Sequence, residues 1–326
     1  MDKLLTFSVA AYNVDAFLEN TLGTLADPRL VDKLEVFVVD DGGKDRSLEI
    51  ARSFESRFPG TFHPVHKENG GYGSTVNYSI SHASGKFFKL LDGDDWIDTE
   101  GLCKVLSILE NCDDDIIVTE YCMGPSPDDL GVVPTGMGDG VTVPVKEYDP
   151  PIPHGMWALF YKTEILRRCA LTLPEHTLYT DQLYSTIPFS VGQSIRFINT
   201  PVYCYRVGRE EQSTSKASRI RHAEEMFSVC DTLYRFYDRH KGETPYILRR
   251  ISRYYVTALK TLLLFPPNRE NRKRLMQYER NARRDHPEIY RAALDSGAAG
   301  KLLNILRKTG YSAYWLVKFV PDRYLT

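Results

Sequence analysis

The sequence predicts an α/β protein in which a doubly wound, mostly parallel sheet is followed by a helical region. Over the first hundred residues, short apolar runs alternate with amphipathic segments, and polar clusters follow directly on several of the apolar runs. Beyond residue 215 only helical periodicity remains. Repeated strand–helix–strand units imply a parallel sheet, whose ligands bind beyond the carboxyl ends of the strands.

Near-continuous apolar runs of strand length are typical of strands that helices cover on both faces. On this basis we expect strands at Leu4–Ala11, Leu34–Val39, Phe62–His66, Lys86–Leu91 and Ile116–Tyr121. Apolar residues at helical spacing predict the intervening helices, at residues 17–25, Ser47–Phe58, Ser74–Ala83 and Leu102–Leu109.

The middle of the chain, Gly124–Pro153, is rich in Gly, Pro and Asp and reads as an irregular excursion or a hairpin insert. Helices are expected again further on, at Ile220–His240, Tyr246–Leu264 and Arg269–Arg284. We therefore divide the chain into an α/β domain at 1–215 and a basic helical region at 216–326.

Composition favours a globular protein of the cytoplasm. Of the 326 residues, 42% are hydrophobic and 26% charged, which is ordinary for a soluble domain. The N-terminus lacks the pattern of a signal peptide, and no apolar run is long enough for a spanning helix. The six cysteines have neither metal-site nor disulfide-framework spacing, which favours reduced thiols.

The net charge of −2 hides an asymmetry: residues 1–215 carry 18 basic and 32 acidic side chains, and residues 216–326 carry 23 and 11. The basic region could face an anionic acceptor, the inner surface of a membrane, or only solvent. Its Lys301–Lys318 segment, which mixes apolar, aromatic and basic residues, could lie on a membrane or pack as a helix. Nucleic-acid binding is disfavoured, since acidic residues are interspersed.

Three carboxylates, Asp92, Asp94 and Asp95, directly follow the apolar run that ends at Leu91. They repel one another unless a cation or hydrogen-bond donors neutralise them, and hard oxygen ligands suit Mg²⁺ or Mn²⁺. The alternative is an Asp-rich turn without a ligand.

Two further clusters could contact a nucleotide. Asp40 and Asp41 end a strand and precede two glycines, and carboxylates accept hydrogen bonds from a base or ribose. Asp45 or Ser47 then fits the N-cap of the next helix. The segment Glu68–Ser74 is a glycine-rich entry to a helix, although it matches neither a Walker loop nor a dinucleotide fingerprint.

In this order, the motifs resemble the N-terminal half of family-2 glycosyltransferases, which have the GT-A fold of nucleotide-diphospho-sugar transferases. The matching segments are Ser8–Asn13, Val39–Asp45, Asn69–Gly73 with Asn77, and Gly85–Phe88 leading to Asp92–Asp95. The sequence departs from the family at Ala10-Ala11, where Pro-Thr or Pro-Val is frequent, and at Gly43, where Ser is usual. Neither departure removes a side chain that does chemistry.

The resemblance implies a donor site and a metal. It makes 1–215 a GT-A catalytic domain, in which 1–100 would bind the nucleotide sugar and 101–215 would serve the acceptor and catalysis. Asp94, with Asp92, would hold Mn²⁺ or Mg²⁺, and Asp92 would also touch the ribose. One of Asp40 and Asp41 would contact the base, usually uracil. The complete set of expected nucleotide-binding residues is Ala10, Tyr12, Asp40, Asp41, Asn69, Gly71, Asn77, Asp92 and Gly93.

The family also places a catalytic carboxylate at the start of a later helix, often as Glu-Asp. Here Thr180-Asp181 is the match, so Asp181 is the candidate general base; its alternative role is a first-turn residue favourable to the helix dipole. The family's later segment often closes over the donor pyrophosphate, which makes Arg206, Arg209, Gln212 and Ser213 diphosphate candidates. They could instead form a solvated loop. His154 could line the acceptor site or be structural.

The resulting hypothesis is a metal-dependent, inverting transfer of a hexosyl or N-acetylhexosaminyl group. The donor would be a UDP-sugar, and the acceptor a glycan, a polyol phosphate or a lipid-linked glycan of the cell surface. Two alternatives stay open: a nucleotidyltransferase, disfavoured because Ala10–Asp15 contains no Lys, Arg or Gly, and a nucleotide-sugar-binding protein without turnover.

Overall fold

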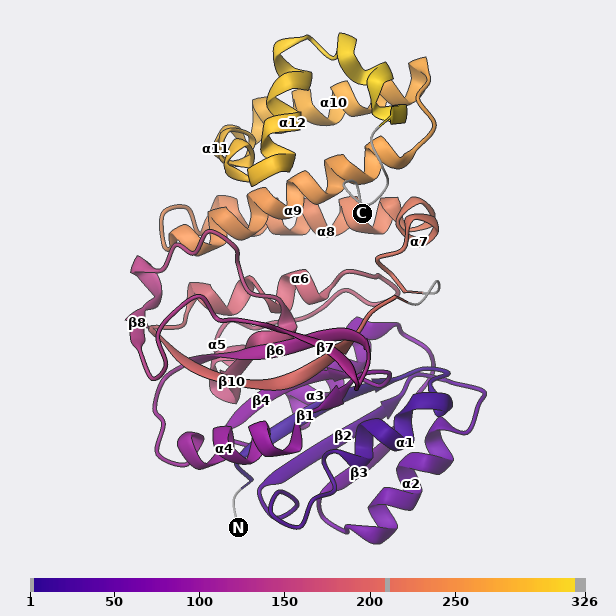
Figure 1. Ribbon diagram of the computed structural model, residues 1–326, viewed down its shortest axis with the longest axis vertical. Helices are drawn as coiled ribbons and strands as arrows, with labels where there is room; N and C mark the ends of the chain where they lie inside the picture. The colour runs from indigo at the N-terminus through magenta and orange to yellow at the C-terminus, as the bar shows by residue number, and fades with distance from the viewer. Residues whose placement is uncertain (1–2, 209–211, 320–326) are drawn as a thin grey trace. The chain divides into compact units, whose positions relative to one another are not determined.

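The structure is a computed structural model that describes residues 3–208 and 212–319 (Figure 1). The chain forms two compact units, of which the first contains the sheet and the second is helical. The second unit comprises Tyr148–Pro153 and Glu210–Thr326, and the rest of the chain forms the first. This division rests on contacts within the chain and does not test the functional boundary expected at residue 215, which stays a prediction.

The first four main strands form a parallel sheet. They are β1 (Leu5–Ala11), β2 (Leu34–Asp40), β3 (Phe62–His66) and β4 (Phe87–Asp92), in the spatial order β3-β2-β1-β4. Their side chains are almost entirely buried along β1, β2 and β4, as expected for strands covered on both faces. The carboxyl ends of β1, β2 and β4 therefore meet at one edge, where the predicted polar clusters lie.

The sheet then continues as β4-β9-β6-β10-β5. Strand β9 (Leu159–Lys162) lies antiparallel between β4 and β6 (Ile116–Ser126), whereas β10 (Ser194–Arg206) is parallel to β6 and antiparallel to the short β5 (Trp96–Ile97). The expected insert contains β7 (Asp129–Val133), which forms a hairpin with β6, and then β8 (Thr142–Pro144), which pairs with β10. Strand β10 brings residues from late in the chain beside the Asp cluster.

Helices connect the strands of the first unit. They are α1 (Asp15–Gly23), α2 (Ser47–Arg57), α3 (Tyr72–His82), α4 (Thr99–Leu109), α5 (Thr163–Arg168) and α6 (Asp181–Tyr184), with 3₁₀ turns at Val145–Glu147, Met156–Ala158 and Ile187–Ser190. Figure 1 shows α1 and α2 lying together beside β2 and β3. Asp45 accepts hydrogen bonds from the backbone N–H groups of Ser47 (3.0 Å) and Asp15 (2.8 Å), so it joins the starts of α2 and α1.

The second unit is built from helices. They are α7 (Lys216–Arg221), α8 (Ala223–Arg239), α9 (Pro245–Leu264), α10 (Arg269–Asp285), α11 (Pro287–Ala292) and α12 (Gly297–Lys308), with 3₁₀ turns at Ala293–Asp295 and Ser312–Phe319. Figure 1 shows α8 and α9 side by side. Within the described ranges, no helix is long and apolar enough to cross a membrane.

The helix expected at roughly Ile220–His240 corresponds to α8, and a break that the sequence did not predict separates it from α7. The chain breaks at His222, whose φ of −105° and ψ of 24° leave the helical region. Its imidazole Nδ1 lies 2.6 Å from the carboxylate of Glu225 in the first turn of α8. The break therefore begins a new helix with its own side-chain interaction at the N-terminus.

Candidate active site

The Asp cluster is a tight turn that joins β4 to β5. The N–H of Gly93 donates to the carbonyl of Ala10 on β1 (3.1 Å), and the N–H of Asp95 donates to the carbonyl of Asp92 (3.1 Å). A Cβ atom on Gly93 would lie 2.7 Å from the Ala10 oxygen. Glycine is thus required here because the turn approaches β1 too closely for a side chain.

The three carboxylates converge, since one oxygen from each of Asp92, Asp94 and Asp95 lies within 4.8 Å of the others. Burial raises the pKa of Asp92 well above its usual range, and the charges of Asp95 and Asp94 add to this rise. Its Oδ1 atom is buried without a hydrogen-bond partner among the described residues. This arrangement fits a divalent cation. The cation would bind the buried oxygen and reduce the repulsion between the carboxylates.

Asp95 differs from its neighbours because both of its oxygens are bonded by β10. The Tyr203 hydroxyl donates to Oδ2 (2.5 Å), and the Arg206 N–H donates to Oδ1 (2.8 Å). Burial and the charge of Asp94 still raise the pKa of Asp95 to about 8, against the effect of these two bonds. Asp95 therefore anchors the turn to β10.

Arg206, a diphosphate candidate, contacts the same turn. Its Nε donates to the Asp94 carbonyl (3.0 Å), and its guanidinium carbon lies 4.7 Å from the Trp96 ring centre and 5.1 Å from that of Phe17. Stacking and hydrogen bonding together hold this planar cation in one orientation. A positive charge is thereby fixed beside the carboxylates.

Two residues that support this turn were missed by sequence reasoning. Thr21 of α1 donates to the carbonyls of both Gly93 (3.0 Å) and Asp95 (2.6 Å). Tyr203 also accepts from the Asp92 N–H (3.2 Å). Nothing in the local sequence signals these contacts, because they join segments more than 70 residues apart.

Asp41 organises the glycine-rich segment. Its carboxylate accepts from the N–H groups of Gly70 (2.9 Å) and Gly71 (2.7 Å), and from the Lys67 ammonium group (2.8 Å). The Asn69 side chain in turn donates to the Asp41 carbonyl (2.9 Å). Two predicted nucleotide residues, Asp41 and Asn69, are thus joined in one loop structure.

Asp40 is also bonded within the chain, to the Gly43 N–H (3.0 Å) and to the His66 ring (2.6 Å). Its carboxylate is buried, so a base would have to approach through these partners. Tyr12, in contrast, is 53% exposed at the end of β1, next to the half-buried Ala10. Asp40, Tyr12 and Ala10 thus lie with Asp41 at one sheet edge.

A second loop, residues 173–176, packs on the glycine-rich segment. Asn77 donates to the Leu173 carbonyl (2.9 Å) and accepts from its N–H (2.8 Å), while the His176 N–H donates to the Gly70 carbonyl (2.6 Å). The amide of Asn77 is therefore used for loop packing. The loop leads directly to Asp181, and sequence reasoning did not identify it.

Asp181 lies at the start of α6, half-buried, within electrostatic range of the Asp cluster. Its charge contributes to the raised pKa values of both Asp92 and Tyr72, for which burial is the largest cause. Tyr179, two residues before it, has a φ of +63°, a conformation that a tyrosine seldom adopts. The structure thus brings this carboxylate to the cluster from about 90 residues further along the chain.

The remaining predicted residues are less connected to this site. Arg209 lies outside the described residues, and Gln212 and Ser213 belong to the second compact unit. His154 is half-buried, with its ring 6.1 Å from that of Phe197 on β10. Their roles toward the donor or the acceptor stay predictions.

The fold and the Asp turn define the first unit as a nucleotide-diphospho-sugar transferase fold of the GT-A type. Residues 6–135 match the model described as glycosyl transferase family 2. The solved structure of Staphylococcus aureus TarS 1–349 superposes with a TM-score of 0.61 at 17% identity, over 94% of this chain and 92% of that chain. The family-2 match therefore lies within the first unit, over residues 6–135.

Relatives found by sequence carry related names. The chain is 26% identical over 216 residues to the putative glycosyltransferase EpsH of Bacillus subtilis, which covers 61% of this chain and 59% of EpsH. It is 24% identical over 223 residues to the S. aureus poly(ribitol-phosphate) β-N-acetylglucosaminyltransferase TarS, covering 66% of this chain and 38% of TarS. The chain thus spans less than two thirds of either relative.

Proposed function

We propose that this protein is a metal-dependent, inverting glycosyltransferase that moves a sugar from a UDP-sugar to an acceptor hydroxyl in cell-surface glycan synthesis. The observation that carries the proposal is the convergence of Asp92, Asp94 and Asp95, whose carboxylate oxygens lie within 4.8 Å of one another. Two of these carboxylates, on Asp92 and Asp94, are able to hold a cation, and Asp181, whose charge acts on Asp92, is able to accept a proton. A family-2 domain and relatives named glycosyltransferases support the same reaction class.

Asp94 and Asp92 would hold Mn²⁺ or Mg²⁺, and their convergence and the unpaired Oδ1 of Asp92 support this assignment. Such an ion, when bound, neutralises charge on a diphosphate leaving group, which is worth several kcal/mol. Asp95 would keep the turn in place through Tyr203 and Arg206. Arg206 would add a fixed positive charge beside the leaving group.

Asp181 would act as the general base that takes the proton of the acceptor hydroxyl as the new glycosidic bond forms. A carboxylate can take this role, because it accepts a proton from a hydroxyl held against it. The unusual backbone at Tyr179 supports a constrained approach to the base. An inverting outcome follows if the hydroxyl attacks in a single displacement, and the anomeric configuration of the product tests it.

For the donor, we propose UDP linked to a hexose or an N-acetylhexosamine. Support comes from TarS 1–349, of the same fold, which has been solved in complex with UDP-GlcNAc (TM-score 0.57, 16% identity). The base and ribose would lie against Ala10, Tyr12 and the loops joined by Asp41. Five other predicted residues would fix the conformation of the loops around the donor and would not bind it through their side chains. They are Asp40, Asn69, Gly71, Asn77 and Gly93.

The acceptor would be a glycan, a polyol phosphate or a lipid-linked glycan, reached from the cytoplasmic side. Six unpaired cysteines support a reducing compartment. A peripheral membrane contact through the basic region is supported by exposed apolar side chains beside Lys301 and Lys308, namely Leu294, Ile305, Trp315 and Leu316. His154, Gln212 and Ser213 stay candidates for acceptor or diphosphate contacts.

The deciding experiment measures binding and slow hydrolysis of UDP-, GDP-, CDP- and dTDP-sugars, with and without Mn²⁺, for the wild type and Asp94→Ala. We expect metal-dependent binding of one UDP-sugar, lost in Asp94→Ala. Asp139→Ala, which removes an aspartate of the hairpin insert, is the matched control and should bind as the wild type does. Failure of every nucleotide sugar to bind would overturn the proposal, and release of pyrophosphate from a nucleoside triphosphate would favour a nucleotidyltransferase.

A further inference from the structure

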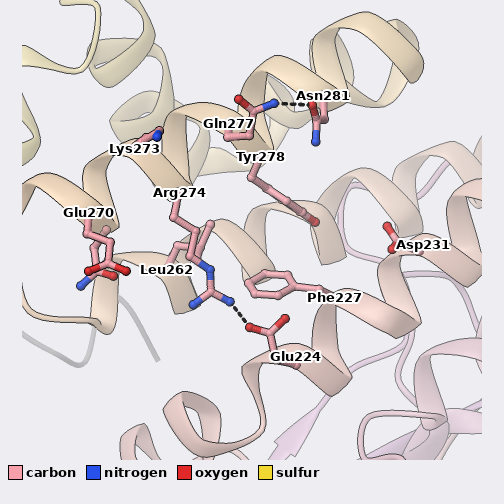
Figure 2. Close-up of a pocket in the computed structure, with 11 residues that line it drawn as sticks. Glu224, Phe227, Asp231, Leu262, Glu270, Lys273, Arg274, Gln277, Tyr278 and Asn281 are labelled. Carbon is pink, nitrogen blue, oxygen red and sulfur yellow. Dashed lines mark hydrogen bonds and ion pairs between the residues drawn. The ribbon is translucent and has the colours of Figure 1, made fainter.

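A groove of about 590 Å³ lies within the helical unit, between α8, α9 and α10. This volume is in the range of small-molecule sites. Figure 2 shows Phe227 of α8 and Tyr278 of α10 in the middle of the groove, with Glu270 toward one end and Asp231 toward the other. All of these residues belong to one compact unit, so the groove exists without any contribution from the sheet.

The base of the groove is aromatic. The rings of Phe227 and Tyr278 have centres 5.2 Å apart and are tilted by 48°, and the side chain of Leu262 adds to this surface. The Tyr278 hydroxyl is bonded to that of Tyr234 (2.9 Å), which fixes the ring. Both rings are half-buried. The groove thus offers a rigid apolar surface that is still open on one side.

The rim carries carboxylates and amides. Gln277 donates to Asn281 (2.8 Å) one turn further along α10, and both side chains are exposed, as is Asp231 across the groove. An amide both donates and accepts, and a carboxylate accepts up to four hydrogen bonds. Such a rim matches a ligand with several hydroxyl groups, each of which also donates and accepts.

The charges of the rim disfavour an anionic ligand. Three carboxylates, Glu224, Asp231 and Glu270, outnumber the two cations, Lys273 and Arg274. Arg274 is moreover paired with Glu224, and its guanidinium carbon lies 5.2 Å from the centre of the Phe227 ring. A phosphate polymer or a nucleic acid would meet net negative charge here, although the helical region as a whole is basic.

We propose that this groove binds a neutral saccharide chain, in which pyranose rings pack on Phe227 and Tyr278 and their hydroxyls pair with Asp231, Gln277 and Asn281. The apolar face of a sugar ring buries well against an aromatic ring, and its hydroxyls need partners at the edge. The site would hold a glycan apart from the reacting hydroxyl. This proposal depends on the proposed function only because that function suggests saccharides as the probes.

The test measures binding of chitohexaose, cellohexaose and maltohexaose by saturation-transfer NMR and calorimetry, with UDP and Mn²⁺ present at saturation. The wild type should bind at least one of these neutral chains. Gln277→Ala/Asn281→Ala should weaken it about tenfold, because two hydrogen bonds of ordinary strength are lost. Phe227→Leu, which keeps an apolar side chain, should weaken it as much.

Arg283→Ala, an exposed change on the same helix, is the matched control and should bind as the wild type does. Thermal unfolding checks each fold, and the exposed double variant suffices if Phe227→Leu does not fold. The proposal is overturned if no neutral chain binds at millimolar concentration, if the groove variants bind normally, or if only an anionic hyaluronan oligosaccharide binds. Failure of UDP-sugar binding alone would overturn the proposed function and leave this result intact.

Discussion

The three carboxylates of the Asp turn have different surroundings, and these surroundings separate their roles. Asp95 has both oxygens bonded, to Tyr203 and Arg206, whereas Asp92 keeps one buried oxygen without a partner among the described residues. The backbone carbonyl of Asp94 accepts a hydrogen bond from Arg206, and the Asp94 carboxylate converges with those of Asp92 and Asp95. We therefore expect Asp92 and Asp94 to serve a ligand and Asp95 to serve the fold.

At Asp181, the change to Asn keeps the shape and removes the capacity to take up a proton. Turnover should fall by about 10²–10⁴, the usual contribution of a general base, while donor affinity stays within about twofold. Steady-state kinetics and UDP-sugar calorimetry measure the two quantities. Glu175→Gln, an exposed carboxylate in the preceding loop, is the control. An Asp181→Asn enzyme with wild-type turnover would exclude Asp181 as the base.

Asp41→Asn tests the loop structure through its pH dependence. Burial alone would raise the pKa of Asp41, but the Lys67 ammonium group and the N–H groups of Gly70 and Gly71 outweigh it and lower the pKa below its ordinary value of 3.8. Because the pKa is lower in the folded state, the charged carboxylate stabilises the fold above that value, and this stabilisation is lost as the pH falls through the folded-state pKa.

The free energy of unfolding should drop by about 1–3 kcal/mol in Asp41→Asn at neutral pH, and the difference from the wild type should shrink at about pH 4 and below. Urea unfolding followed by tryptophan fluorescence in a Trp315→Phe background reports on the first unit, which contains the other two tryptophans, Trp96 and Trp157. Asp32→Asn, an exposed change, should show no such pH trend. A pH-independent difference would contradict the assignment.

At the scale of elements, the sequence predicted strands, including one at Met156–Tyr161 and one that ends before Arg209, but not the order in which the later strands join the sheet. Apolar runs located β1, β2 and β4 to within one or two residues because each is buried on both faces. The insertion of β9 between β4 and β6 joins strands about 70 residues apart, which no local pattern reveals. The burial of Lys89 in β4 could not be predicted either, because its ammonium group donates to the Trp157 carbonyl (2.7 Å), almost 70 residues away.

The packing of α3 on the loop before Asp181 leads to a prediction for Gly73→Ala. A Cβ atom on Gly73 would lie 2.3 Å from the Pro174 carbonyl oxygen and 3.0 Å from the Leu173 side chain, so the loop must move. We expect a loss of about 1–3 kcal/mol in unfolding free energy, as for other overpacked sites. Turnover should fall as well, because the same loop positions Asp181.

Gly23→Ala is the matched control, since a Cβ atom there meets nothing within 4 Å and the residue ends α1. It should leave both stability and turnover at or slightly above the wild-type level, given the higher helix propensity of alanine. Chemical denaturation and steady-state assays of both variants provide the comparison. Equal behaviour of Gly73→Ala and Gly23→Ala would mean that the loop does not depend on this contact.

At the scale of the whole molecule, the two units have different kinds of core. The first is built on a sheet whose strands are mostly apolar, with a few buried polar side chains such as Thr6, Glu35 and Lys89. The helical unit instead contains a polar network at its centre, in which Glu279 of α10 pairs with Arg307 of α12 (2.6 Å) and accepts from the hydroxyls of Tyr311 (2.5 Å) and Tyr255. This network joins α9, α10 and α12 and pairs one buried cation of the basic region with a carboxylate.

The change Glu279→Gln should therefore destabilise the helical unit selectively. It would leave the nearly buried Arg307 guanidinium without its counter-charge, and removing one partner of a buried pair typically costs about 3–5 kcal/mol. Amide hydrogen exchange should show faster exchange in α9, α10 and α12, with β1 and β2 as internal reference. Asp285→Asn, which removes an exposed partner on the same helix, should change little. Equal protection in the two variants would show that the network does not stabilise the helical unit.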